Sequence, residues 1–142
     1  MRTDRVDIIE HSNEKANAWV NEVTRELGID DRKDAFRMLR AFLHALRDRL
    51  TVDEAAQLAA QLPTLIRGIY YEGWHPSATP QPYRDARTFL ERIAQEADLA
   101  GETEASYAVQ GLAAVLRRRI SEGELDDVLH ALPPEVRALL AG

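Results

Sequence analysis

Apolar residues recur along this chain at intervals of three and four positions, the spacing that places them on one face of an α-helix. The first stripe of this kind is Ala16, Trp19, Val20, Val23 and Leu27. We expect Ser12 or Asn13 to cap the start of this helix and Gly28 to end it in a left-handed conformation. Residues 1–11 are expected to form a polar lead-in, with a single helical turn at 6–9.

Asp30 and Asp31 open a longer helix that we expect to reach about Leu50, because carboxylates accept hydrogen bonds from the free N–H groups at a helix start. Its inward residues are Ala35, Met38, Leu39, Phe42, Ala45 and Leu46. Phe36 and Leu43 widen this stripe to a second side, which predicts the central helix of its half of the chain.

The following helices are marked by the residues at their starts. Thr51 and Glu54 have the spacing of a capping box, and Pro63 suits the first turn of a further helix. A linker with three prolines follows at 73–82. Further helices are expected at about 83–97, 102–120, 122–131 and 133–140. The alternating pattern of a β-strand is absent, so the sequence predicts an all-α protein.

The second half of the chain repeats the first at an offset of 70 residues, without a gap. Leu-Arg-Asp-Arg-Leu-Thr at 46–51 aligns with Leu-Arg-Arg-Arg-Ile-Ser at 116–121. The Leu-Pro pair at 62–63 aligns with another at 132–133. An internal repeat of this length indicates one structural unit written twice.

The expected fold is a helical bundle built from two tandem four-helix repeats within a single domain, residues 1–142. Repeat one covers about 13–72, the linker 73–82, and repeat two about 83–141. A unit of about 50 residues is marginal alone, so the two are expected to pack together about a pseudo-twofold axis. Candidates for that contact are Trp19, Phe36 and Tyr107.

Several charged residues are identical at equivalent positions of the two halves, and four of these pairs lie in the helix ends and turns that repeat. These pairs are Arg47/Arg117, Arg49/Arg119, Glu54/Glu124 and Arg67/Arg137. Arg67 and Arg137 each follow a proline by four residues, and each is expected to bond the capping glutamate or a helix C-terminus of its own unit. We interpret the four pairs as structural.

Composition places the chain among ordinary folded proteins. Its 142 residues are 45% hydrophobic, enough for one domain with a core, and contain no cysteine, which excludes disulfides and thiolate metal sites. Neither a signal peptide nor a membrane-spanning run is evident, so a soluble cytoplasmic protein is expected. The net charge of −6 disfavours binding to nucleic acid or anionic lipid. Arginine outnumbers lysine 16 to 2, which suggests a bacterium with a GC-rich genome.

Two adjoining segments, 46–63 and 65–74, resemble the bacterial and archaeal proteins grouped as domain of unknown function 2267. The most specific part is Leu-Pro followed by Tyr-Tyr-Glu-Gly-Trp at 70–74. The resemblance covers about 15–140. It implies an all-helical cytosolic protein and offers no catalytic residue to transfer.

The first candidate site is an aromatic segment that has no counterpart in the second half. Its residues are Tyr70, Tyr71, Trp74 and His75. Aromatic side chains that a core does not need often anchor a partner, so we predict a partner-binding role for all four. The alternative is structural: Tyr70 and Trp74 would fill the junction between the units, and Tyr71 would cap the helix.

The second candidate is a basic face on the second helix. Its residues, spaced by four and three, are Lys33, Arg37, Arg40, His44 and Arg47. The equivalent residues of the second half are almost uncharged, so this face could dock an acidic partner. The alternative is a solvated face balanced by nearby carboxylates such as Asp34 and Asp48.

Motifs for reactive chemistry are absent. His44 and Asp48 have the i, i+4 spacing of a helical metal site, but one such pair is a weak signal, and the other three histidines offer no more persuasive spacing. The sequence also lacks a glycine-rich phosphate loop and a Gly-x-Ser-x-Gly nucleophile turn. We therefore expect no metal, no cofactor and no enzyme activity.

These observations favour a non-enzymatic helical module that binds a protein partner or itself, the latter as a homodimer through Tyr71, Trp74 and His75. Two alternatives stay open. One is a nucleic-acid-binding or regulatory protein that uses the basic face, although the net charge disfavours nucleic acid. The other is a small-molecule binder with a pocket between the repeats.

Overall fold

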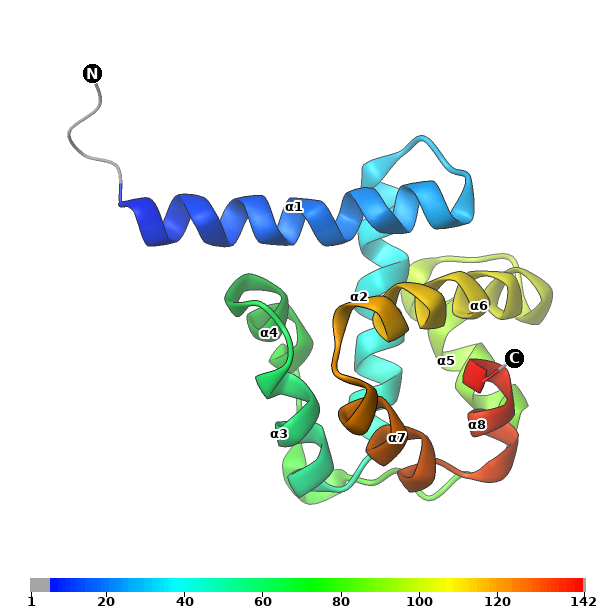
Figure 1. Cartoon of the computed structure of the whole chain (residues 1–142). Helices are drawn as coiled ribbons and strands as arrows, with labels where there is room; N and C mark the ends of the chain where they lie inside the picture. Colours follow the sequence, from blue (N-terminus) through cyan, green and yellow to red (C-terminus); the bar gives the residue numbers. More distant parts are fainter. Residues whose placement is uncertain (1–5, 142) are drawn as a thin grey trace.

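The computed structural model describes residues 6–141, and helices make up most of this range (Figure 1). In chain order they are α1 (Asp7–Leu27), α2 (Arg32–Arg49), α3 (Val52–Ala60), α4 (Thr64–Tyr71), the 3-10 helix η1 (Pro76–Ala78), α5 (Ala86–Ala97), α6 (Glu102–Arg119), α7 (Glu122–Ala131) and α8 (Pro134–Ala141). No strand occurs between residues 6 and 141, so the prediction of an all-α protein is confirmed. None of the helices in this range combines the length and apolar character needed to cross a bilayer. The first five residues of the predicted lead-in lie outside the described residues.

α2 lies at the centre of the bundle and contacts α1, α3, α4, α5 and α6. Residues 41–47 in its middle and last turns are all buried, and Phe42, Leu43 and Leu46 have no exposed surface. This position agrees with the two-sided apolar stripe of the sequence, because a helix that is apolar on two sides needs neighbours on both.

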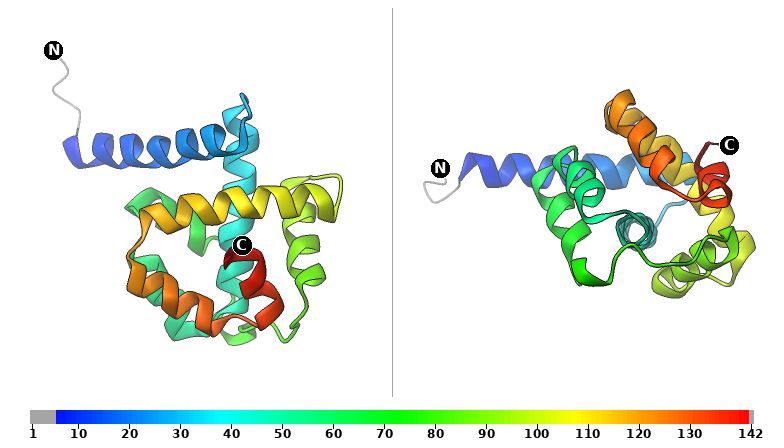
Figure 2. Two further views of the ribbon diagram at one scale, coloured as in Figure 1. Left: turned by 45° about the vertical axis from the view of Figure 1, so that its right-hand side comes forward. Right: turned by 90° about the horizontal axis from the view of Figure 1, so that it is seen from below.

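The first four helices and the last four share one hydrophobic core. α2 packs on α5 and α6, α1 packs on α6, and α3 packs on α7 (Figure 2). α1 and α6 approach closely at Gly111, where a Cβ atom would collide with the Leu27 side chain. A side chain at this position would therefore require the Leu27 side chain to move.

The three residues predicted at the contact between the halves have different positions. Trp19 is buried there, with the guanidinium of Arg119 above its ring. Phe36 is partly buried against the core. Tyr107 is 63% exposed, and its prediction is wrong because it shares the outer face of α6 with Glu104.

Helix ends follow their local signals. Gly28 ends α1 in the left-handed conformation, with φ of 66°. Thr51 starts α3 with a complete capping box. Arg67 donates from Nε to the Ala59 carbonyl oxygen at 2.8 Å and from Nη2 to the Leu62 carbonyl oxygen at 3.0 Å. Its predicted bond to a helix C-terminus is thus confirmed.

α1 begins earlier than the sequence pattern predicts. It is helical from Asp7, and the Ser12 hydroxyl donates to the Ile8 carbonyl oxygen at 3.0 Å instead of capping a helix start. The prediction of a start at Ser12 or Asn13 is therefore wrong, and much of the expected lead-in is helix. As a result, the first half of α1 projects beyond the rest of the bundle (Figure 1).

The linker is held against α2. Its backbone forms η1, and the Gln81 N–H donates to the Asp48 carbonyl oxygen at 2.8 Å. Arg49 then donates from Nε to the Tyr83 carbonyl oxygen, also at 2.8 Å. These bonds fix the path from α4 to α5 along the end of α2.

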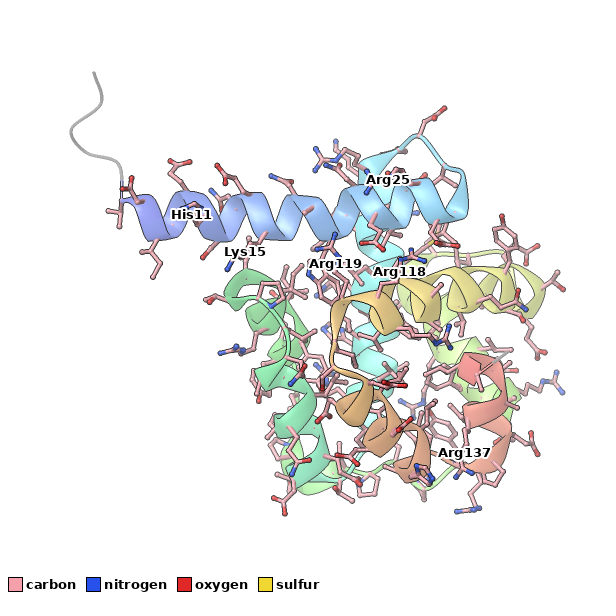
Figure 3. All side chains as sticks on the ribbon, viewed as in Figure 1. His11, Lys15, Arg25, Arg118, Arg119 and Arg137 are labelled. Carbon is pink, nitrogen blue, oxygen red and sulfur yellow. The ribbon has the colours of Figure 1, made fainter. Side chains whose placement is uncertain are left out.

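Glu22 joins α1 to the end of α6. Its carboxylate accepts hydrogen bonds from Arg119 Nε at 2.6 Å and from Arg118 Nε at 2.5 Å, and Figure 3 shows both arginines beneath α1. Burial by itself raises the pKa of the Glu22 carboxyl, but the bonds from Arg118 and Arg119 outweigh burial and lower that pKa.

We expect Glu22→Gln to lower the free energy of unfolding by about 2 kcal/mol at neutral pH, because it removes a charged acceptor shared by two arginines. A carboxyl with a lowered folded-state pKa stabilises the fold above its unfolded-state pKa, about 4.3, and loses this contribution as pH falls through the folded value. Urea denaturation curves of wild type and variant should therefore converge in acid. Glu91→Gln, which breaks an exposed pair with Arg87, should leave stability close to that of wild type, because solvent screens exposed ion pairs. A Glu22 effect that persists unchanged in acid would contradict this explanation.

Candidate functional site

The aromatic segment at the end of α4 begins with a fully buried residue. Tyr70 has 0% of its surface exposed, and its hydroxyl donates to the Ala55 carbonyl oxygen at 2.8 Å. Burial raises the pKa of this phenol. Tyr70 cannot contact a partner without unfolding, so its prediction as a partner-binding residue is wrong. The physical reason is α3, which covers this side of α4 and which helical spacing alone cannot place.

The remaining aromatic residues form a short stack. The rings of Tyr71 and Trp74 are stacked with centroids 5.2 Å apart, and both side chains are half-buried against the core. The Trp74 indole N–H is enclosed without a hydrogen-bond partner among the described residues. His75 is exposed. The segment therefore offers a small surface, and its role in partner binding stays a prediction.

The predicted basic face of α2 is accessible only near the helix start. Lys33 is exposed there. Arg37 donates to Asp34 at 2.6 Å, and Arg40 donates to Glu72 at 3.2 Å. The two arginines are thus paired with carboxylates at the protein surface.

His44 lies inside the protein, where α2 meets α4 and α5. Its Nδ1 is 2.8 Å from the Glu96 carboxylate, and its Nε2 is 2.8 Å from the Ile69 carbonyl oxygen. A cavity of about 330 Å³ opens beside it, lined also by Asp48 and Arg92. A histidine next to carboxylates can act as a general base, but both ring nitrogens already face protein acceptors.

Arg47 fastens the end of α4 to α2. It is 4% exposed and donates from Nη1 to the Tyr70 carbonyl oxygen at 2.9 Å and to the Glu72 carbonyl oxygen at 2.6 Å. Its Nε donates to Asp48 at 2.9 Å. The prediction of one accessible basic face is therefore wrong for His44 and Arg47, because α4 and α5 cover its second half.

A cleft that no sequence pattern predicted lies between the projecting half of α1 and α4. Its volume is about 410 Å³, and Ile9, Leu65 and Ile69 make its wall largely apolar. Six large apolar side chains are exposed within residues 6–141. Four of them belong to the start of α1 and to α4: Val6, Ile8, Ile9 and Leu65. Of these four, Ile9 and Leu65 line the cleft, which we call the apolar cleft.

A second cavity adjoins the apolar cleft along the same half of α1, and Ser12 and Thr64 line both. Its volume is about 560 Å³, and it is lined by α1, the turn from α3 to α4, and the end of α6. Lys15, Arg67 and Arg119 supply its charged side chains, and we call it the basic pocket. Within residues 6–141, no group of three His, Asp or Glu side chains could hold a metal ion.

Comparison with known proteins places the chain in a family without assigning an activity. No curated protein matches it. A family model described as an uncharacterized conserved protein matches residues 16–139. This range confirms the resemblance found in the sequence at about 15–140, and the family description names no site residue. The chain therefore belongs to the DUF2267 family of uncharacterized conserved proteins.

Proposed function

We propose that the protein is a non-enzymatic helical interaction module, and that it binds a second copy of itself through the apolar cleft and the projecting half of α1. The observation that carries this proposal is the gathering of exposed apolar side chains there, with Ile9 57% and Leu65 42% exposed. A large exposed apolar patch often marks an interface. Burial of each such side chain contributes roughly 1.5–3 kcal/mol.

The shape of this end of the molecule supports a second copy as the partner. Ile9 stands on the ridge formed by the projecting half of α1, where it lines the apolar cleft together with Leu65 and Ile69. In a twofold contact the same surface is used by both molecules. The ridge of each copy would then enter the cleft of the other.

We further infer that the chain consists of two tandem repeats. α6 begins and ends 70 positions after α2, and α8 begins and ends 70 positions after α4. Arg137 donates to the carbonyl oxygens of Leu129 at 2.8 Å and Leu132 at 3.1 Å, the equivalents of the contacts made by Arg67. α1 packs on α6 and α5 packs on α2, which agrees with a pseudo-twofold axis.

The repeat explains why the proposed interface occurs in one half only. α1 has 21 residues, whereas α5, its equivalent, has 12. The additional length of α1 is the projecting half that carries Ile8 and Ile9. Because only the first copy has these additional residues, the surface that they form lies on the first copy alone.

Size-exclusion chromatography with light scattering tests the association. We expect wild type to be dimeric at high micromolar concentration, and the double variant Ile9→Glu/Leu65→Glu to be monomeric, because it would bury unpaired charges in an apolar contact. Far-UV circular dichroism should be unchanged. Tyr107→Glu is the matched control, since Tyr107 is an exposed aromatic residue on α6 and does not line the apolar cleft.

Two results would contradict the proposed interface. The first is a wild-type protein that stays monomeric at millimolar concentration. The second is a dimer that survives the double substitution but is lost in Trp74→Ala, which would return the interface to the aromatic segment.

A further inference from the structure

Every permanently charged side chain that lines the basic pocket is positive. Lys15, Arg67 and Arg119 converge on it, His11 lies at its edge, and no carboxylate is part of its lining. Figure 3 shows Lys15 on the side of α1 that faces α4, with Arg119 close to it. The whole chain carries a net charge of −6. A concave site whose charge opposes that of the protein attracts anions locally.

The two arginines are held in place by the protein. Arg67 is fixed by its hydrogen bonds to the end of α3. Arg119 donates from Nε to Glu22, and its guanidinium carbon lies 5.8 Å from the centroid of the Trp19 ring. Within residues 6–141, the terminal nitrogens of Arg119 and the Lys15 ammonium have no protein acceptor. These donors are available to a ligand.

We propose that the basic pocket binds an oxyanion of the phosphate class. A guanidinium presents planar donors that match two oxygens of such a group, and an ammonium adds rotatable donors. Thr64 also lines the pocket. Ile8 and Trp19 form an apolar part of its wall, and its volume of about 560 Å³ exceeds that of the ion alone. The site therefore fits a small organic phosphate monoester as well as free phosphate, and it does not depend on self-association.

Isothermal titration calorimetry with inorganic phosphate, at constant ionic strength, tests the site. We expect saturable binding in the millimolar range and a weakening of about 10-fold or more in Lys15→Ala, because that variant removes a charged donor. Lys33→Ala is the matched control, since Lys33 is the other lysine of the chain and lies exposed at the start of α2. It should bind phosphate as wild type does. Lys15 is itself exposed, so its replacement should leave the far-UV circular dichroism spectrum unchanged.

Phenyl phosphate distinguishes the two sources of the oxyanion. Tighter binding than that of inorganic phosphate would assign the pocket to a phosphorylated small molecule, and equal affinity would assign it to the free ion. Absence of saturable binding of either probe, or an equal loss in Lys15→Ala and Lys33→Ala, would overturn the proposal. Lys15→Ala should keep the oligomeric state of wild type, so failure of this site and failure of the apolar interface give different results.

Discussion

Arg47→Ala is expected to lower the free energy of unfolding by about 3–5 kcal/mol, the range seen when one partner of a buried charged pair is removed. Arg47 is 4% exposed, and its side chain donates hydrogen bonds to the Tyr70 and Glu72 carbonyl oxygens and to the Asp48 carboxylate. Alanine would leave the buried Tyr70 carbonyl oxygen without this donor, and it would also remove the donor to the part-buried Glu72 carbonyl oxygen and Asp48 carboxylate. Guanidinium denaturation followed by far-UV circular dichroism measures the loss.

Arg117→Ala is the control that the second half offers. Arg117 lies 70 positions after Arg47 and donates to the Leu140 carbonyl oxygen at 2.7 Å, but its own side chain is exposed. Water can replace that donor, so we expect a loss of about 1 kcal/mol. Equal losses in the two variants would show that burial of Arg47 has no energetic consequence, and that its contribution to stability has another cause.

The contrast between these arginines shows what helical spacing can and cannot predict. The spacing from Lys33 to Arg47 correctly places the five basic side chains on one face of α2. The groups that cover the face come from elsewhere in the chain: Glu96 lies 52 positions from His44, and the Glu72 carbonyl lies 25 positions from Arg47. No pattern within one helix contains such partners.

Helix boundaries were predictable because their causes are local. Gly28 ends α1, and Thr51 caps α3 with a glutamate three residues later. Ser121 accepts a hydrogen bond from the Glu124 N–H at 3.1 Å and starts α7 in the same way. A cap needs only residues within about four positions. The sequence signal of a cap therefore does not depend on residues elsewhere in the chain.

The start of α1 shows the opposite case. Ile9 lies seven residues before Ala16, so the apolar stripe of α1 continues upstream of Ser12, and this signal was available in the sequence. The polar residues around it favoured a lead-in instead. Even a correct helix start would not have predicted the apolar cleft, because the cleft is formed by Ile9 of α1 together with Leu65 of α4. The fold alone brings α4 beside this part of α1.

Tyr70→Ala is expected to lower the free energy of unfolding by about 3–5 kcal/mol, because it removes a fully buried aromatic side chain and leaves a cavity. Tyr70→Phe keeps the ring and removes only the hydroxyl that donates to the Ala55 carbonyl oxygen, so its cost is about 1 kcal/mol. Urea denaturation of both variants at neutral pH separates the contribution of the ring from that of the hydroxyl.

The pH dependence of stability tests the same burial independently. Because burial raises the pKa of Tyr70, the unfolded chain ionises this phenol at lower pH than the folded protein does. The resulting stabilisation is fully present below the unfolded-state pKa, about 10, and is lost as the pH rises above it. Wild type should therefore lose stability above about pH 10 more steeply than Tyr70→Phe. A Tyr70→Ala variant that unfolds like wild type but no longer self-associates would show that Tyr70 is a partner contact after all.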